Sequence, residues 1–115
     1  LQEGWTFTGL IHPTAVISKF SEVATDAQIH ANAVVQANTK IGNGVIINSN
    51  AVIEHDCTVG EWAHIAPSAT ICGGCVVSNE CLVGSNATLV PFQTVEKGSL
   101  VRAGQIFARK NISKN

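Results

Sequence analysis

The chain has 115 residues, with 7 Lys or Arg, 8 Asp or Glu and a net charge of −1. That length allows one domain with a thin core, and the near-neutral charge argues against nucleic-acid binding as the main task. No apolar run reaches membrane-spanning length and no signal peptide is visible, so we expect a cytoplasmic protein that does not bind membranes.

The first ten residues, 1–10, are expected to form a lead-in or linker. After them, every sixth residue is Ile, Val or Leu up to Val101, and Phe107 continues the series. A period of six suits neither a helix nor an alternating strand, but it suits a chain that turns a corner every six residues. The series reads Ile11, Ile17, Val23, Ile29, Val35, Ile41, Ile47, Ile53, Val59, Ile65, Ile71, Val77, Val83, Leu89, Val95, Val101.

Three hexads per turn of a triangular coil give 18 residues per rung, so residues 18 apart should stack about 4.8 Å apart. Corner residues at this spacing are mostly Asn or Gly, which tolerate positive φ: Thr14, Asn32, Asn50, Ser68, Asn86 and Gly104. The fifth residue of each hexad is small and forms a second inward position: Ala15, Ser21, Ala27, Ala33, Thr39, Val45, Ala51, Cys57, Ala63, Ala69, Cys75, Cys81 and Ala87.

The sequence therefore predicts an all-β parallel β-helix of about five triangular rungs over residues 11–107, followed by a basic tail, residues 108–115. The repeat resembles that of the hexapeptide-repeat family, and the resemblance implies a left-handed coil and a trimer. Handedness rests on the resemblance alone, because parallel crossovers in general favour the right-handed form. Burying the sixteen aliphatic residues at about 2 kcal/mol each stabilises the chain by less than ordering it costs, so a subunit interface is expected to contribute.

Four cysteines raise the possibility of a metal site or a disulfide. Cys72 and Cys75 form a C-x-x-C, but the chain has no second such pair and a zinc site needs about four ligands. Cys57 and Cys75 are one rung apart and should stack near bonding distance. Because Cys57, Cys75 and Cys81 occupy the small inward position, we interpret them as buried reduced thiols.

The segment 48–74 reads NSNAVIEHDCTVGEWAHIAPSATICGG. It resembles the NeuD/PglD type of sialic acid O-acetyltransferases and nucleotide-activated amino-sugar N-acetyltransferases, in which an I-E-H-[DE]-C segment carries the catalytic His. The resemblance implies a general base with two acidic neighbours and three contacts to substrate or acetyl-CoA. The base is His55, its neighbours are Glu54 and Asp56, and the contacts are Asn48, His64 and Gly73.

The position of His55 agrees with this role on physical grounds. As the third residue of its hexad it should sit at a corner, where an imidazole can reach a ligand and accept a proton near neutral pH. Either Glu54 or Asp56 could hold one ring nitrogen as a donor and leave the other free to accept. Gly73 follows one full rung later, so its N–H could stabilise a developing oxyanion beside His55.

His64 is half a rung from His55 and should face another side of the prism. The two could meet only across a subunit interface, so we expect active sites between protomers, three per trimer. His12 and His30 form a polar stripe with Asn48 and are interpreted as structural. Two corner aromatics, Trp62 and Phe92, could line a ligand groove or wedge the trimer, and the sequence does not choose between these.

Five of the seven basic residues follow position 96: Lys97, Arg102, Arg109, Lys110 and Lys114. This basic end could bind a polyanion such as coenzyme A, with Arg102 and Lys110 as contacts. It could equally be a solvated tail.

The expected function is transfer of an acetyl group from acetyl-CoA, without a metal, to an amino or hydroxyl group of a sugar or nucleotide-sugar. The acceptor and the choice between N- and O-acetylation stay open. One alternative is a zinc enzyme of the carbonic anhydrase kind, which would need three converging His. The other is a non-catalytic binding or assembly module, or a remnant of a larger transferase. It is favoured because relatives carry an N-terminal Rossmann-like domain and a G-[VN]-P-A segment, which this sequence lacks.

Overall fold

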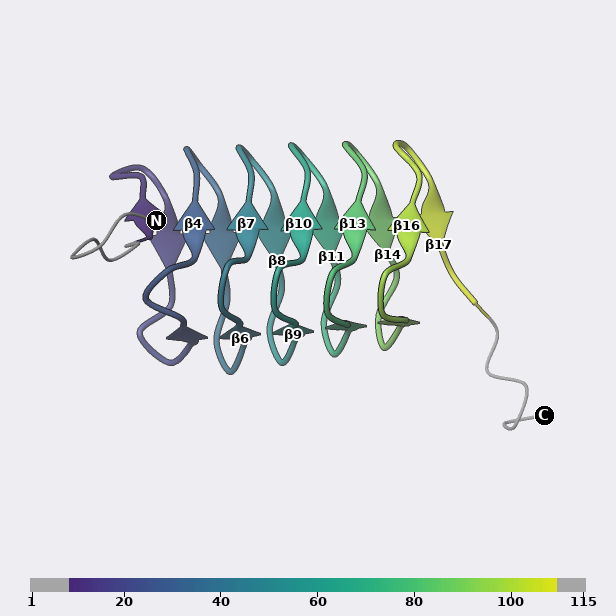
Figure 1. The fold of residues 1–115 in the computed structure, drawn as a ribbon, viewed down its shortest axis with the longest axis horizontal. Helices are drawn as coiled ribbons and strands as arrows, with labels where there is room; N and C mark the ends of the chain where they lie inside the picture. The colour runs from purple at the N-terminus through teal and green to yellow at the C-terminus, as the bar shows by residue number, and fades with distance from the viewer. Residues whose placement is uncertain (1–8, 110–115) are drawn as a thin grey trace, which may run out of the picture.

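The computed structural model describes residues 9–109, which form a single parallel coil built from strands of two residues joined by tight turns (Figure 1). Its three sides are three parallel sheets, here called sheets A, B and C in chain order. Among these residues there is no helix long and apolar enough to cross a membrane. The predicted all-β parallel β-helix is confirmed.

Every strand pairs with the strand one rung before or after it. Sheet A contains β1 (Leu10–Ile11), β4 (Gln28–Ile29), β7 (Ile46–Ile47), β10 (His64–Ile65), β13 (Leu82–Val83) and β16 (Leu100–Val101). Sheet B contains β2 (Val16–Ile17), β5 (Val34–Val35), β8 (Val52–Ile53), β11 (Thr70–Ile71), β14 (Thr88–Leu89) and β17 (Ile106–Phe107). Sheet C contains β3 (Glu22–Val23), β6 (Lys40–Ile41), β9 (Thr58–Val59), β12 (Val76–Val77) and β15 (Thr94–Val95).

The register between rungs is the one that three hexads per turn predicted. Ile53 of β8 pairs with Ile71 of β11, and Val59 of β9 pairs with Val77 of β12. All the other paired strands are likewise aligned so that partners are 18 residues apart. Hydrogen bonds follow the same step: the Glu54 N–H donates to the Ile71 carbonyl at 2.8 Å. Position along the coil axis can therefore be read directly from residue number.

The core is a stack of the residues that recur every six positions. Ile29, Ile47, Ile65 and the others through Val101 are at most 3% exposed, and the small fifth residues pack beside them. Ile11 differs from the prediction, because it is 54% exposed at the first rung that the structure describes and has no rung to cover it there. Ile17 and Val23 on the same rung are half-buried, and the inward residues from Ile29 onward are buried.

The corners use left-handed backbone, as the Asn and Gly pattern predicted. In the A/B corner column the φ angles of Asn32, Asn50, Ser68, Asn86 and Gly104 lie between 60° and 73°, and Thr14 is not in this region. At the other two corners the same conformation falls on Trp62 (φ 63°) and Phe92 (φ 64°), among others. A bulky side chain in this region is strained, and such strain is commonest at functional sites.

The outward strand residues give the three sheets different surfaces. On sheets A and B they are largely apolar, including Leu10, Leu82 and Leu100 on sheet A and Val16 and Ile106 on sheet B, all exposed. On sheet C they are Glu22, Lys40, Thr58, Val76 and Thr94. Two faces of the prism therefore present apolar rows, and the third is mostly polar.

Asn50 tests the requirement for left-handed backbone at the corners. Replacing Asn50 by Val should lower the free energy of unfolding by about 1–2 kcal/mol, because a β-branched residue is disfavoured at φ 63°. Asn50→Gly should be nearly neutral, which chemical denaturation of both variants would check. Equal destabilisation by both would show that the Asn side chain matters and the backbone angle does not.

Candidate functional site

His55 lies on the turn between β8 and β9, at the corner that joins sheets B and C. Its Nδ1 is 2.8 Å from Oδ2 of Asp56, and the two side chains are 64% and 57% exposed. Asp56 takes the left-handed backbone conformation, with φ 61°. The predicted corner position of His55 is confirmed, with its imidazole open to a ligand.

Of the two acidic neighbours that the sequence left open, only Asp56 contacts the imidazole. A carboxylate has no proton to donate, so this contact favours the tautomer with the proton on Nδ1 and leaves Nε2 as an acceptor. Glu54 takes part through its backbone: its carbonyl accepts a hydrogen bond from the Thr39 hydroxyl at 2.9 Å. The histidine and carboxylate arrangement is therefore His55 with Asp56.

Gly73 lies directly beside His55 on the next rung, as the spacing of one full turn predicted. A Cβ added at Gly73 would lie 2.9 Å from Cε1 and 3.0 Å from Nε2 of His55, so the imidazole packs in the space that a side chain would fill. Within residues 9–109, no hydrogen bond uses the Gly73 N–H. The corner thus combines a proton acceptor with a backbone donor that has no partner in this part of the chain.

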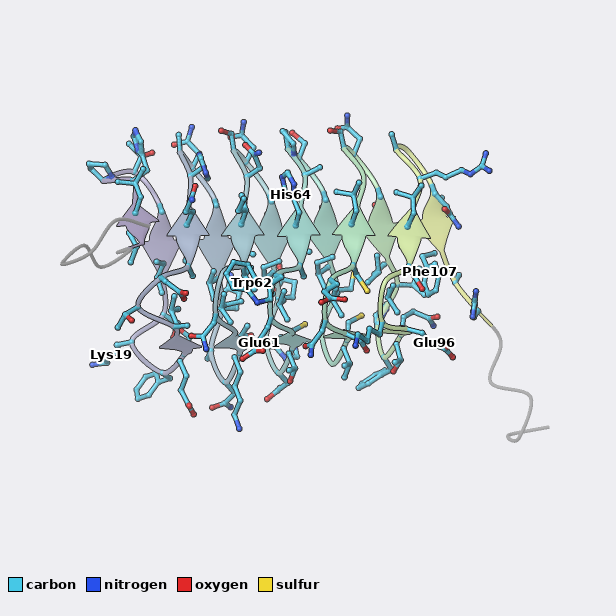
Figure 2. All side chains as sticks on the ribbon, viewed as in Figure 1. Lys19, Glu61, Trp62, His64, Glu96 and Phe107 are labelled. Atoms are coloured by element: carbon cyan, nitrogen blue, oxygen red, sulfur yellow. The ribbon has the colours of Figure 1, made fainter. Side chains whose placement is uncertain are left out.

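Asn48 and His64 come together with each other but not with His55. Nδ2 of Asn48 is 3.4 Å from Nε2 of His64, and Oδ1 of Asn48 accepts from the Ser49 N–H at 2.8 Å. His64 projects outward from β10 of sheet A (Figure 2), and Asn48 follows β7 at the A/B corner. One chain therefore presents two separate groups of predicted site residues.

Of the two coenzyme contacts predicted at the basic end, Arg102 is also apart from His55. Arg102 is exposed at the A/B corner, where its N–H donates to Oε1 of Gln105 at 2.9 Å. Lys110 lies outside the described residues.

Arg109, which the sequence reasoning did not single out, lies three whole rungs beyond His55 along the same corner. Its guanidinium is 5.2 Å from the centre of the Phe107 ring. The whole number of rungs between the two residues was the signal that could have identified Arg109.

The two strained aromatic residues each lie over a glycine of the preceding rung. Phe92 is 82% exposed and its ring covers Gly74, next to Gly73 on the B/C corner. Trp62 is 62% exposed and covers Gly44 on the C/A corner (Figure 2). Phe92 thus lies in the column of Asp56 and Gly74, beside the column that runs from His55 through Gly73 to Arg109.

The cysteines lie where the sequence predicted. Cys57, Cys75 and Cys81 are buried, Cys72 is half-buried, and none forms a disulfide. Burial raises the pKa of the Cys57 thiol to about 11, and burial likewise raises the pKa of Cys75. The described residues contain no group of three His, Cys, Asp or Glu side chains placed to hold a metal ion.

Two open grooves lie on the polar sheet C, away from His55. The larger, of about 410 Å³, includes Lys40, Glu61 and Asn79 in its lining, and the smaller, of about 290 Å³, includes Ser78 and Lys97. Neither is lined by His55 or Gly73. These two grooves do not enclose the B/C corner.

Comparison with known proteins adds evidence independent of this geometry. Residues 38–73, which include the His55 corner and Gly73, match the family model described as bacterial transferase hexapeptide (six repeats). No curated protein matches the sequence.

Several solved structures resemble the chain in both fold and sequence. The acetyltransferase domain of PglB from Neisseria gonorrhoeae, in complex with acetyl coenzyme A, is 32% identical with a TM-score of 0.88, covering 91% of this chain and 51% of that one. PerB from Caulobacter crescentus, in complex with CoA and GDP-perosamine, is 31% identical with a TM-score of 0.90, covering 93% and 52%. Two further structures of the Caulobacter enzyme with these ligands carry one histidine replaced by alanine or asparagine. The chain spans about half the length of these proteins.

A change at Gly73 tests the contact with His55. In Gly73→Ala the new methyl group should displace the imidazole and disrupt the contact between Nδ1 and Asp56, which the ¹⁵N chemical shifts of the ring would report. The free energy of unfolding should change by no more than about 0.5 kcal/mol, because the ring is exposed and can swing away. Gly98→Ala is the control for the ring shifts alone, since nothing lies within 4 Å of its new Cβ but its φ of 72° makes the substitution itself destabilising. Unchanged ring shifts in Gly73→Ala would contradict the observed packing.

Proposed function

We propose that the chain transfers an acetyl group from acetyl-CoA to an amino or hydroxyl group of a sugar or nucleotide-sugar, because residues 38–73 match the hexapeptide transferase family model and the β-helix resembles those of PglB and PerB. The observation that carries the proposal is the single corner where His55, Asp56 and Gly73 converge. PglB and PerB, which share this fold, are described with acetyl-CoA or CoA bound.

In the proposed reaction His55 is the general base. The acceptor nitrogen or oxygen attacks the thioester carbon, so a C–N or C–O bond forms and the C–S bond breaks. Nε2 of His55 takes the acceptor's proton and passes it to the departing CoA thiolate, which leaves as the thiol. Asp56 holds the proton on Nδ1 and stabilises the imidazolium that forms between these two transfers, as a neighbouring carboxylate does in other histidine bases.

Gly73 is the proposed donor to the oxyanion of the tetrahedral intermediate. Its N–H has no partner within residues 9–109, and the missing side chain lets the His55 imidazole lie against it, so the proposed base and the proposed donor are side by side. The B/C corner then continues through Phe92 to Arg109. We assign Phe92 as an apolar contact and Arg109 as a phosphate contact for the coenzyme, because a polyanion bound along this corner would reach both. Lys110 is proposed to assist from the same end.

The apolar outward rows of sheets A and B support a trimer. In a threefold assembly with the A/B corners at the axis, sheet A of each protomer would pack against sheet B of the next. His64, which projects from sheet A, would then face sheet B of the neighbouring protomer, and with Asn48 beside it is proposed to contact acceptor or coenzyme there. Arg102, at the A/B corner, would lie near the axis of this assembly.

The base assignment is tested by His55→Ala. We expect the turnover of amino-sugar nucleotides with acetyl-CoA to fall by about 10²–10⁴-fold. The rate is measured by the release of the CoA thiol. His12→Ala is the matched control, because His12 is an exposed corner histidine on the A/B side. Sedimentation should show the same assembly for both variants. A wild-type rate in His55→Ala would refute the assignment.

The subunit arrangement is tested by mixing inactive variants. If His55 and His64 act from different protomers, co-refolding equal amounts of His55→Ala and His64→Ala should restore about a quarter of wild-type activity, since a quarter of random interfaces carry both histidines. Either variant refolded alone should stay impaired. No recovery from mixed trimers would place both histidines in sites within one chain.

The second candidate, a non-catalytic binding or assembly module, is favoured by the two grooves on sheet C that do not include His55. A thermal-shift titration separates the two. Acetyl-CoA at 100 times its Kd should stabilise a transferase by about 2.7 kcal/mol through linkage. A melting temperature that does not respond to acetyl-CoA would favour the module.

A further inference from the structure

The turns at two corners of the coil are closed by different hydrogen bonds. At every A/B turn the N–H of the fourth residue donates directly to the carbonyl of the first, as from Ala51 to Asn48 at 3.2 Å and from Ala69 to Ala66 at 3.2 Å. At the B/C corner only the first turn has this bond, from Ser21 to Ser18 at 3.1 Å. The turns at 36–39, 54–57, 72–75 and 90–93 lack it among the bonds within residues 9–109.

Thr39 takes the place of the missing bond in the turn that carries His55. Its hydroxyl donates to the Glu54 carbonyl at 2.9 Å and accepts from the Cys57 N–H at 3.4 Å. Glu54 and Cys57 are the first and last residues of that turn, and His55 and Asp56 lie between them. Thr39 is 0% exposed and is the one buried polar side chain in the described part of the chain. One hydroxyl therefore bridges both ends of the turn from inside the coil.

Thiols take a similar place on the following rungs, with a single bond to the turn for Cys57 and two for Cys75. The Cys57 Sγ–H donates to the Cys72 carbonyl at 3.2 Å, directly before Gly73. Cys75 donates to the Val90 carbonyl at 3.1 Å and accepts from the Gln93 N–H at 3.4 Å. The raised pKa of Cys57 keeps its thiol protonated at neutral pH, as a donor requires. We call Thr39, Cys57 and Cys75 the inner donor column.

The column coincides with the candidate site. The equivalent inward positions at the A/B corner are Ala15, Ala33, Ala51, Ala69 and Ala87, which have no side-chain donor. At the C/A corner Cys81 donates to the Glu96 carbonyl at 3.0 Å, but the Ser99 N–H also closes that turn directly. Donors in place of the direct backbone bond thus occur on three successive rungs at the corner of His55 and Gly73.

We propose that Thr39 is a positioning residue for His55, and that Cys57 has the same role for Gly73. The Thr39 hydroxyl fixes the peptide groups on both sides of His55 and Asp56, and so holds the imidazole against Gly73. Without it, the half-buried Glu54 carbonyl and the buried Cys57 N–H lose their partner, and the turn must rearrange to regain one. The inference rests on the proposed acetyl transfer, because the role concerns the geometry of its base.

Thr39→Val removes the hydroxyl and keeps the shape of the side chain. Val45 occupies the equivalent inward position at the C/A corner and is fully buried, so a valine fits such a site. We expect kcat to fall by about 10- to 100-fold with little change in KM, as when a group that orients a catalytic residue is lost. Thr39→Ser keeps the hydroxyl and should retain most of the activity.

Cys57→Ala and Cys81→Ala form a matched pair. Each removes one buried thiol that donates to a carbonyl 15 residues later, but only Cys57 lies at the corner of His55. Both should lower the melting temperature, while only Cys57→Ala should lower kcat. Equal losses of kcat in the two variants would show general destabilisation and would overturn the positioning role of Cys57.

A measurement without turnover separates this inference from the proposed function. The ¹⁵N shifts of the His55 ring, assigned by their loss in His55→Asn, should move in Thr39→Val and stay as in the wild type in Thr39→Ser and Cys81→Ala. If the wild type acetylates no acceptor, the transferase proposal fails, and these shifts still decide the role of Thr39. Unchanged ring shifts in Thr39→Val would overturn the positioning role. If Thr39→Val does not fold, displaced ring shifts in Thr39→Ser would overturn that role, because the serine keeps the hydroxyl.

Discussion

The register of the backbone ladders, one full turn of three hexads, is the constraint on which the structure depends. Each strand has only two residues, so no strand could persist without the hydrogen bonds that join it to the next rung. Those bonds align the inward Ile, Val and Leu side chains into one column per sheet, and they align the corners in the same way. The candidate site follows from this alignment, since His55 and Gly73 meet because they occupy the same place on successive rungs.

The three corners of the coil differ in the chemical groups that they carry. Left-handed backbone turns the chain at all three, but only the B/C corner combines a histidine, a carboxylate and a glycine with side-chain donors beneath them. The A/B corner has alanine inside and direct backbone bonds that close each of its turns. Strained aromatic residues over glycines add apolar surface at the other two corners. A repeat that is uniform in its core is thus specialised at its edges.

Much of the fold and of the candidate site could be predicted, because in a regular repeat the number of residues between two positions fixes how far apart they lie in space. The β-helix, the inward position of Cys57, the corner position of His55 and its contact with Gly73 all follow from counting hexads and rungs. The pairing of His55 with Asp56 did not, because flanking residues both lie within reach and only rotamers and backbone angles decide between them. The role of Thr39 was also missed, since in the pattern it counts simply as a small inward residue. The available signal was that the inward positions of the B/C corner carry Thr39, Cys57 and Cys75, whereas the equivalent positions of the A/B corner carry alanine.

The same register makes the molecule modular in length. His55 and Arg109 are separated by three whole rungs, so removing or duplicating one rung between them would shift their separation by one step of about 4.8 Å and leave every corner in phase. Removing a single residue would instead rotate all later side chains out of their columns. A coil of this kind can therefore gain or lose whole rungs, and so change the distance between two sites along a corner, without altering the corner that holds His55.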